Sequence, residues 1–296
     1  MTRIGVIINP SSGRGKGKAL GEELLRLLAA TAFEVVNLSG IDLDGARENG
    51  RRAIAGGEID GLVVLGGDGM MNLGVNLCVG TNVPLLVIGA GTGNDSAREL
   101  GMPIYDVAAS VAHLEKFASR PTAVDVVRVE NPDGVFHYFG SVSAGFDAIV
   151  NARANRWVWP KGSIRYPLAM LRELPVFKPI HYRVTVDGKV RELDAMLIAV
   201  ANAPAYGGGM KIAPHANVRD GLLELFIVHK MKRLELVKMF PTVYTGGHVT
   251  HPAVEFVQGR EVTLEAQGLP AFADGERVGR APLTAKVLPG ALKVYA

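Results

Sequence analysis

The sequence has one cysteine, few aromatic residues and no long apolar run. Because Cys78 is the single cysteine among 296 residues, an internal disulfide is excluded and a reducing compartment is favoured. No apolar stretch approaches the roughly 18 residues of a membrane-spanning helix, and the apolar residues after Arg3 are too few for a signal peptide. We therefore expect a soluble cytoplasmic protein.

The chain also lacks a strong charge of either sign. Its 32 basic and 29 acidic residues leave a net charge of +3, which does not predict the broad positive field of a nucleic-acid-binding protein. An isoelectric point near 8.9 would still tolerate an anionic membrane surface. Hydrophobic residues make up 48% of the chain, enough to fill one large α/β domain or two of medium size.

Short apolar segments alternate with helical patterns in the first part of the chain. This alternation predicts a parallel sheet with helices on both faces, whose ligand-binding loops follow the carboxyl ends of the strands. The expected strands are Ile4 to Ile8, Phe33 to Leu38, Leu62 to Leu65 and Pro84 to Ile88, and the expected helices are Ala19 to Ala30, Arg47 to Ala55, Asn72 to Leu77 and Asp95 to Leu100.

Beyond about residue 120 the pattern changes to strands separated by turns. We expect a doubly wound α/β nucleotide-binding domain over residues 1–123 and a mostly antiparallel, β-sandwich-like domain over residues 124–296, with a return of the last segment to the first domain as an option. The expected strands are Ala123 to Val129, Phe136 to Val142, His181 to Val186, Ala195 to Ala201, Leu222 to Val228, Val254 to Val257 and Val262 to Glu265, with helices near Tyr166 to Leu174 and Leu234 to Tyr244.

Glycine surrounds one carboxylate directly after the apolar run that ends at Leu65. The segment Gly66-Gly67-Asp68-Gly69 would leave backbone N–H groups free to approach phosphate oxygens, with an acid beside them for a metal or a polar group. An ordinary tight turn has the same composition. The interpretation as a nucleotide site therefore depends on other segments of the chain.

Two more glycine-bearing segments follow expected strands. Asn9 to Gly17 supplies glycines, hydroxyls and two cations ahead of a helix, and Gly91-Thr92-Gly93-Asn94-Asp95 opens another helix. Neither is the P-loop motif or the Rossmann G-x-G-x-x-G motif. A solvated loop is the alternative for the first segment, and a simple N-cap after a turn is the alternative for the second.

Together, these three segments resemble the catalytic domain of the diacylglycerol kinase-like lipid kinases, which include bacterial diacylglycerol kinases and sphingosine and ceramide kinases. That family carries N-P-x-S-G, G-G-D-G-T-x-N-E and G-T-x-N-D-F-A segments in this order. Its later blocks resemble Asn202 with Gly207 to Gly209, Pro214 to Ala216, Asp220 to Glu224, and Asp274-Gly275-Glu276. The resemblance covers nearly the whole chain.

The resemblance implies an ATP-binding cleft between two domains, with the acceptor alcohol entering from the second. Asp68 would contact the nucleotide or its metal, and we count it among the catalytic residues. The nucleotide-binding residues implied in this way are Asn9, Pro10, Ser11, Ser12, Gly13, Ser39, Gly66, Gly67, Asp68, Gly69, Met70, Asn72, Thr92, Asn94 and Asp95.

Glu276 matches the glutamate that the family uses as the base drawing the proton from the lipid hydroxyl. A carboxylate within hydrogen-bond reach of the hydroxyl contributes about 10² to 10⁴ in rate. Considered without the resemblance, an Asp-Gly-Glu segment is most often a hairpin turn with a solvated acid.

Asp220 resembles a carboxylate that binds a structural Mg²⁺ in the family. The ion's other ligands are backbone carbonyls, here those of Asn217 and Leu222. A β-turn aspartate explains Asp220 equally well.

Three positions depart from the family pattern. Met70 replaces the threonine after G-G-D-G, Leu73 replaces an acid, and Ser96 replaces a phenylalanine. Met70 removes a hydroxyl that would donate to phosphate, and Leu73 deletes a carboxylate. These changes leave open a nucleotide- or lipid-binding protein with weakened or lost catalysis.

The resemblance implies an ATP- and Mg²⁺-dependent lipid kinase, with diacylglycerol as the expected acceptor and phosphatidic acid as the product. Other acceptors remain open: a sphingoid base, phosphatidylglycerol, or a soluble alcohol as in the NAD kinases. We expect peripheral contact with the inner membrane face, no nucleic-acid partner, and a homodimer as an option. Cations and aromatic residues suited to a bilayer interface gather at Arg153, Arg156, Trp157, Trp159, Lys161, Arg165 and Tyr166, although a packed, partly exposed helix and loop explain this cluster equally well.

Overall fold

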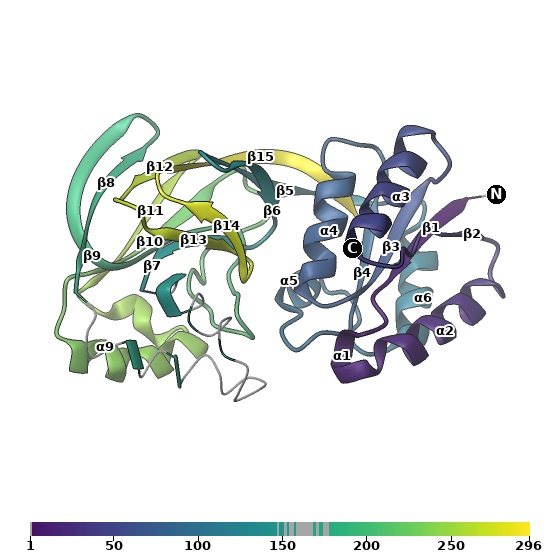
Figure 1. Ribbon diagram of the computed structural model, residues 1–296, viewed down its shortest axis with the longest axis horizontal. Coiled ribbons are helices and arrows are strands. Elements are labelled where there is room, and N and C mark those ends of the chain that lie inside the picture. The colour runs from purple at the N-terminus through teal and green to yellow at the C-terminus, as the bar shows by residue number, and fades with distance from the viewer. Residues whose placement is uncertain are drawn as a thin grey trace. The chain divides into compact units, whose positions relative to one another are not determined.

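The computed structural model describes residues 2–146, 148–150, 153, 157, 168–169, 172–173 and 178–296 (Figure 1). Most of the cation and aromatic cluster expected at a bilayer interface, and most of the helix expected at Tyr166 to Leu174, lie outside the described residues. The chain forms two compact units. The first comprises Met1–Val126 and Pro289–Ala296, and the second Val127–Leu288.

The first unit contains a parallel sheet in the strand order β2-β1-β3-β4. Its strands are β1 (Arg3–Ile8), β2 (Glu34–Asn37), β3 (Gly61–Gly66) and β4 (Leu85–Gly89). The end of β15 (Leu283–Val294) adds to this sheet, since Val294 pairs in parallel with Leu85. Every residue of β3 and β4 is buried, as expected for central parallel strands covered on both faces.

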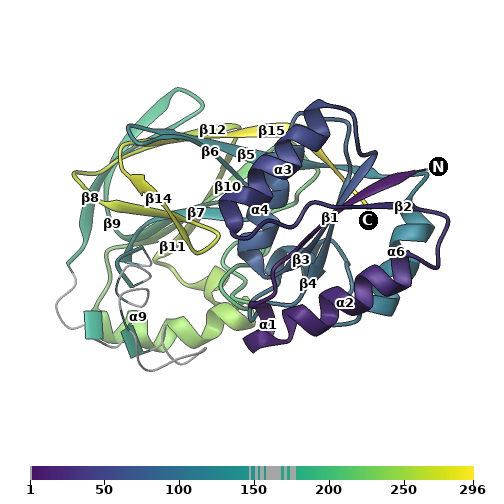
Figure 2. The ribbon, with the colours of Figure 1, turned by 45° about the vertical axis from the view of Figure 1, so that its right-hand side comes forward.

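Helices cover both faces of this sheet. In Figure 2, α3 and α4 lie on one face, and α2 and α6 lie on the other. The helices of this unit are α1 (Ser12–Gly15), α2 (Gly17–Leu28), α3 (Leu43–Ala55), α4 (Asp68–Cys78), α5 (Asp95–Glu99) and α6 (Val107–Phe117). The doubly wound α/β architecture expected from the alternation is confirmed, while α1 and α6 were not predicted.

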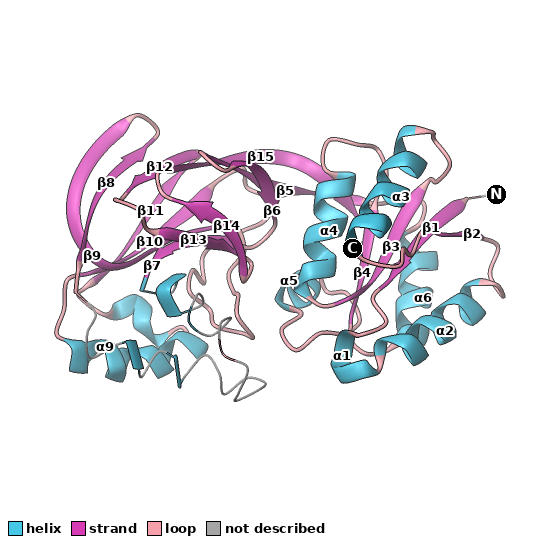
Figure 3. Ribbon diagram, in the orientation of Figure 1, coloured by secondary structure: helices cyan, strands magenta, loops and turns pink. Residues whose placement is uncertain are grey.

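The second unit is built mainly from antiparallel strands, with short helices on one side (Figure 3). Its strands are β5 (Thr122–Asn131), which begins in the first unit, β6 (Gly134–Tyr138), β7 (Ser141–Gly145), β8 (Ile180–Val186), β9 (Lys189–Ala201), β10 (Leu223–His229), β11 (Val254–Gly259), β12 (Glu261–Glu265), β13 (Pro270–Ala273), β14 (Glu276–Arg280) and the first part of β15. Its described helices include α9 (Arg233–Met239) and the 3-10 helices η1 (Phe240–Tyr244) and η2 (Gly247–Thr250).

The sheet of the second unit packs against a different hydrophobic cluster on each face. Successive side chains of a strand point to opposite faces, so Leu225 and Ile227 of β10 join one cluster, while Phe226 and Val228 join the other. The second cluster also contains Leu236 and other residues of α9 and η1. The β-sandwich-like architecture expected for this part of the chain is therefore confirmed.

Two expected elements are each divided in the structure. The strand expected over Phe136 to Val142 is two strands, because β6 ends at Tyr138 and β7 begins at Ser141. The helix expected over Leu234 to Tyr244 is the α-helix α9 followed by the 3-10 helix η1, which has Pro241 in its first turn. Proline removes an N–H donor from the helical ladder, which explains the change of helix type.

Candidate active site

The loops after β1, β3 and β4 lie at one edge of the parallel sheet. The backbone N–H of Asn9 donates to the carbonyl of Leu65 at 3.0 Å, and the N–H of Ala90 donates to the carbonyl of Gly66 at 2.7 Å. These bonds join each outer loop to the end of β3. The structure thus brings together the three glycine-bearing segments, as expected for loops at the carboxyl ends of parallel strands.

Asp68 connects the loop after β3 with the loop after β4. Its Oδ2 accepts from the N–H of Asn94 at 3.1 Å, and its Oδ1 accepts from the N–H of Asp95 at 3.2 Å. Burial raises the pKa of the Asp68 carboxyl, and the nearby negative charge of Asp95 raises it further. Asp68 therefore holds the two loops together and is one member of a like-charge pair.

Glycine is required where these two loops meet. A Cβ atom added to Gly91 would lie 2.4 Å from the Cα of Gly67, and one added to Gly93 would lie 2.3 Å from Oδ2 of Asp68. Real side chains do not approach neighbours this closely. The glycines that suggested phosphate binding therefore have a structural purpose here, which is to let the two loops touch.

Asn94 shapes the loop after β4 from within. It adopts the left-handed conformation with φ of 57° and is only 2% exposed. Its Oδ1 accepts from the N–H of Gly91 at 2.8 Å, and its Nδ2 donates to the carbonyl of Gly91 at 2.7 Å. The hydroxyl of Tyr105 donates to the same carbonyl. Tyr105 was missed in the sequence, where no pattern links it to a glycine 14 residues earlier.

The loop after β1 is organised by its own polar side chains. Oδ1 of Asn9 accepts from both the N–H of Ser11, at 3.0 Å, and the Ser11 hydroxyl, at 2.8 Å. The Ser12 hydroxyl donates to the carbonyl of Asn9 at 2.9 Å. Pro10 and Ser11 are exposed, and Gly13 has a positive φ of 60° that favours glycine.

Ser39 lies beside this loop rather than on it. Its hydroxyl accepts from the N–H of Ile8 at 3.0 Å and so satisfies a backbone donor at the end of β1. The structure thus gives Ser39 a role in fixing the strand end. Its expected contact with a nucleotide stays a prediction.

The helix α4 begins where the glycine-rich segment ends. Gly67 is its N-cap, and Asp68 and the exposed Gly69 form its first turn, where backbone N–H groups have no acceptor within the helix. Thr92, in the loop alongside, is exposed as well. Together with the positive end of the helix dipole, these groups suit an anion such as a phosphate.

Farther into α4, the side chains turn into the core. Met70 is 4% exposed and faces Gly66, and Leu73 is 2% exposed. The Met70 side chain therefore packs below the loop, and only its backbone remains a candidate for nucleotide binding. Asn72 is partly exposed, and its side-chain oxygen accepts from Nδ2 of Asn76 at 3.2 Å.

In the second unit, Asp274 and Gly275 form the tight turn between β13 and β14. Both have positive φ angles, 47° and 84°. The Asp274 carboxylate accepts from three backbone N–H groups, those of Phe139 at 3.2 Å, Gly140 at 3.1 Å and Ser141 at 2.9 Å. This clamp bends the chain between β6 and β7, which explains why the single strand expected there is interrupted.

Asn202 holds the same bend from its other side. Its Nδ2 donates to the carbonyl of Phe139 at 2.8 Å, and its N–H donates to the carbonyl of Gly140 at 2.8 Å. Glu276, the first residue of β14, is exposed next to this anchored turn. The hairpin therefore presents the candidate base on a rigid support, while Asp274 serves the fold.

The residues around Asp220 provide oxygen ligands of the kind that magnesium prefers. Oδ1 of Asp220 accepts from the N–H of Leu222 at 2.9 Å, and the N–H of Asp220 approaches the carbonyl of Asn217 at 3.5 Å. One carboxylate with nearby carbonyls fits an ion that keeps several waters. In the described part of the chain, no three His, Cys, Asp or Glu side chains gather as a metal site.

Glu224 adds a second carboxyl group near Asp220. It is 4% exposed, and its Oε2 has no hydrogen-bond partner among the described residues. Burial raises the pKa of Glu224, the proximity of Asp220 raises it further, and His215 partly offsets the shift. A cation beside Asp220 would relieve this unfavourable burial, so the donor set fits magnesium.

Comparison with known proteins agrees with this arrangement. The model of the diacylglycerol kinase catalytic domain matches residues 3–129, and the model of the YegS C-terminal NAD kinase beta sandwich-like domain matches residues 140–296. A diacylglycerol kinase of Mycobacterium tuberculosis (strain ATCC 25618 / H37Rv) is 35% identical over 99% of this chain and 94% of its own length. The chain belongs to the diacylglycerol kinase-like lipid kinase family.

Two further similar proteins share less sequence identity with this lipid kinase. A diacylglycerol kinase of Bacillus subtilis (strain 168) is 27% identical over 95% of this chain and 92% of its own length. The solved structure of a diacylglycerol kinase from Bacillus anthracis str. Sterne superimposes with a TM-score of 0.75, covering 99% of this chain and 96% of that one at 20% identity. This likeness establishes the fold. In the described residues of the lipid kinase, no helix is long and apolar enough to cross a membrane.

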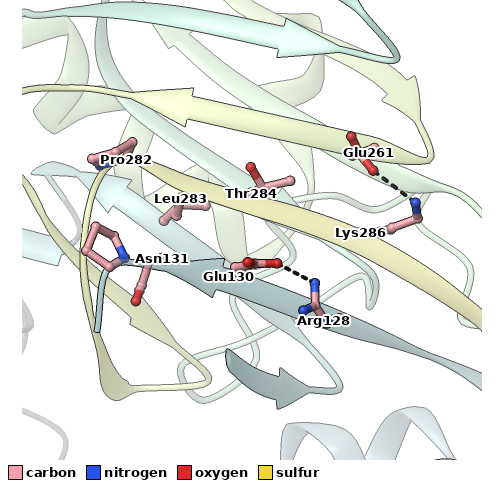
Figure 4. Close-up of a pocket in the computed structure, with 9 residues that line it drawn as sticks. Arg128, Glu130, Asn131, Glu261, Pro282, Leu283, Thr284 and Lys286 are labelled. Carbon is pink, nitrogen blue, oxygen red and sulfur yellow. Dashed lines mark hydrogen bonds and ion pairs between the residues drawn. The ribbon is translucent and has the colours of Figure 1, made fainter. Parts of the chain in front are cut away.

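One hollow of the lipid kinase is lined by none of these residues (Figure 4). It measures about 510 Å³ and lies in the second unit, between the ends of β5, β12 and β15. Its charged side chains neutralise one another, because Arg128 pairs with Glu130 at 2.7 Å and Lys286 pairs with Glu261 at 3.1 Å. None of the expected site residues lines it, and we assign it no role.

Proposed function

We propose that this lipid kinase transfers the γ-phosphate of ATP to the free hydroxyl of diacylglycerol and releases phosphatidic acid. The observation that carries the proposal is the junction at Asp68, where two glycine loops touch beside the open first turn of α4. Such a junction offers fixed backbone donors to a chain of phosphates. The relatives named diacylglycerol kinase support the choice of acceptor.

Glu276 acts as the general base in this proposal. Its carboxylate takes the proton of the acceptor hydroxyl, the hydroxyl oxygen forms a bond to the γ-phosphorus, and the bond between that phosphorus and the bridging oxygen of ADP breaks. Phosphoryl transfer depends mostly on positioning and on neutralising charge, so the proposal needs one general base together with a rigid phosphate site and its cation. The exposed position of Glu276 on an anchored hairpin suits this role.

Magnesium enters the proposal at two places. The like-charge pair of Asp68 and Asp95 would be relieved by the cation that accompanies ATP, since burial and the Asp95 charge both disfavour ionised Asp68. A structural ion would be held by Asp220 with the carbonyls of Asn217 and Leu222. When bound, the first cation would neutralise charge that develops on the phosphates during transfer.

The direct test is phosphorylation of diacylglycerol in mixed micelles by the purified full-length chain with radiolabelled ATP. A matched control lipid is triacylglycerol, which has the same acyl groups but no free hydroxyl. We expect label in phosphatidic acid with the first lipid and none with the second. Sphingosine, phosphatidylglycerol and NAD serve as competing acceptors.

Each other outcome of that assay has a definite meaning. Faster labelling of a competing acceptor would identify that acceptor, instead of diacylglycerol, as the preferred substrate. Binding of ATP by calorimetry without transfer to any acceptor would show a homologue that has lost catalysis. Met70 and Leu73 are buried, so the fold accommodates these departures from the family pattern, and the assay decides whether catalysis does as well. Peripheral membrane contact and homodimer formation also remain proposals.

A further inference from the structure

The helix α9 has an inner face that fixes it to the second unit. Leu236 and Met239 are 8% and 6% exposed and belong to the cluster that also contains Phe226 of β10. The helix continues into η1, where Val243 joins the same cluster. Figures 1 and 3 show α9 along one side of the strands of this unit. Whatever the outer face of α9 contacts is therefore rigidly connected to the sheet that carries Glu276.

Two large apolar side chains of this segment are exposed to solvent. Leu234 is 65% exposed, and Tyr244 at the end of η1 is 44% exposed. Leu234 and Lys238 are four residues apart and share one side of the helix, so the exposed leucine lies beside a lysine. Tyr244 lies edge-on to Phe240 with ring centroids 6.2 Å apart, which restrains its ring.

Basic residues are concentrated around Leu234 in the sequence. Residues 230–238 carry four of the 32 basic residues of the chain and one of its 29 acids. The segment thus has the same net charge, +3, as the entire protein, and the rest of the chain is balanced. Its single acid, Glu235, accepts from the backbone N–H of Lys232 at 3.2 Å and caps the helix. The basic residues of this segment are Lys230, Lys232, Arg233 and Lys238.

We propose that this α9 surface, formed by Leu234, Tyr244 and the four basic residues, docks the protein onto an anionic lipid bilayer. Lysine and arginine attract anionic headgroups, leucine enters the acyl boundary, and tyrosine suits the level of the headgroups. Because several cations act together with an apolar side chain, binding needs no transmembrane helix. The proposal rests on the proposed function, since only a membrane acceptor requires such docking.

A bilayer fits this surface better than a nucleic acid does. Nucleic-acid sites for single strands combine cations with exposed aromatic rings on which bases stack. Here the most exposed apolar side chain is aliphatic Leu234, and the surface has a single exposed ring, Tyr244, which already lies edge-on to Phe240. The α9 surface therefore complements a partner that is negatively charged and also accepts an aliphatic side chain. An anionic lipid bilayer has both properties.

The test is sedimentation of the full-length chain with vesicles of phosphatidylglycerol and phosphatidylcholine, without ATP. We expect Leu234→Ser to weaken the association about tenfold, and the triple variant K232Q/R233Q/K238Q to weaken it about a hundredfold at low salt. Pure phosphatidylcholine vesicles should bind the wild type as weakly as anionic vesicles bind the triple variant. Circular dichroism of each variant establishes that it is folded.

Matched controls change the same residue types elsewhere. Ile41→Ser alters a fully exposed aliphatic residue, and R47Q/R51Q/R52Q removes three cations from α3. Both controls should bind vesicles as the wild type does. Equal weakening by the two triple variants would overturn the proposal, because net charge alone would then explain binding. The proposal would also be overturned if K232Q/R233Q/K238Q bound vesicles as tightly as the wild type does, even if that variant lost binding to an oligonucleotide.

This experiment separates the docking surface from the kinase reaction. With a short-chain, monomerically dissolved diacylglycerol, the α9 variants should keep the kcat and the KM for ATP of the wild type, while their activity on vesicles falls. If no acceptor is phosphorylated at all, but vesicle binding still depends on α9, the proposed function fails and the docking surface stands. If the α9 variants lose activity equally on dissolved and vesicle substrate, the docking proposal fails.

Discussion

Asp68 in the first unit and Asp274 in the second use the same device in different surroundings. Each carboxylate follows a strand and accepts backbone N–H groups from a loop that is distant in sequence. Asp68 accepts two such bonds, and Asp274 accepts three. Backbone N–H groups are fixed donors, so a carboxylate that accepts them fixes the loop.

The difference lies in what surrounds each carboxylate. Asp68 has the negative charge of Asp95 beside it, and burial raises its pKa further. Asp274 grips a bend that includes the fully buried Phe139. The charged form of the first carboxylate is therefore disfavoured, although Asp95 itself pairs with Arg98 at 3.2 Å, whereas the second carboxylate is a structural clamp that supports Glu276. Substitutions at the two clamps should show this contrast in the free energy of unfolding.

The largest loss of stability is expected for Asp274→Ala. This change leaves three N–H groups of a buried bend without their acceptor, and we expect the free energy of unfolding to fall by about 3 kcal/mol. Urea denaturation followed by circular dichroism measures it. Asparagine tolerates the left-handed conformation and keeps one oxygen acceptor. The free energy of unfolding of Asp274→Asn should therefore lie between those of the wild type and Asp274→Ala. An Asp274→Ala loss under 1 kcal/mol would contradict the structural role.

Gly91→Ala should cost about 2 kcal/mol of unfolding free energy, because the new Cβ would meet the Cα of Gly67 at 2.4 Å and force the two loops apart. The affinity for ATP, measured by calorimetry, should fall with it. Gly247→Ala is the matched control, since the nearest atoms to its Cβ lie at 3.4 Å or beyond. An unchanged ATP affinity in Gly91→Ala would contradict this prediction, because nucleotide binding would then not depend on the contact between the two loops.

A smaller effect is expected at Glu255, whose carboxylate is held by the side chains of Arg191 and His229 instead of backbone donors. Arg191 binds it in a bidentate pair at 2.6 and 3.0 Å, and His229 lies 2.6 Å from Oε2. The Arg191 guanidinium lowers the pKa of Glu255 below its ordinary 4.5. Glu255→Gln should therefore lose about 1 kcal/mol at neutral pH.

The pH dependence of this pair has a definite sign. A lowered folded-state pKa stabilises the protein above pH 4.5 and stops doing so as the pH falls through the folded-state value. The stability difference between wild type and Glu255→Gln should thus shrink in urea titrations between pH 6 and pH 3. A difference that grows on acidification would contradict the assigned pair.

The smallest change is expected for Asp68→Asn. A raised folded-state pKa means that the stability contributed by Asp68 is fully present below pH 3.8 and is lost as the pH rises through the folded-state value. Asparagine removes the repulsion from Asp95 but also weakens one of two hydrogen bonds. We expect the free energy of unfolding at neutral pH to change by less than about 0.5 kcal/mol. If Asp68→Asn lowered the free energy of unfolding as much as Asp274→Asn does, the proposed difference between the two carboxylates would be contradicted.

The sequence predicted the location of the loops better than their internal contacts. Alternating strands and helices were enough to place Asn9, Gly67 and Gly91 at one sheet edge, because the carboxyl ends of parallel strands meet there. The bonds from Asp68 to Asn94 and Asp95 join residues 26 and 27 positions apart, and no local pattern encodes such a register.

Other features carried a signal that the sequence analysis did not use. Asp106 caps α6 by accepting from the N–H of Ala109 at 2.8 Å, and an aspartate ahead of a run of helix formers is a recognised helix start. The interruption between β6 and β7 had no such signal. It depends on Asp274, which lies more than 130 residues later in the chain.

The most direct measurement compares wild type with Glu276→Gln in a single-turnover assay of phosphate transfer from ATP to diacylglycerol. Glutamine keeps the size of the side chain but cannot take a proton. The account predicts that transfer slows by about 10² to 10⁴, while the affinity for ATP and the free energy of unfolding stay those of the wild type. Transfer at the wild-type rate in Glu276→Gln would contradict it.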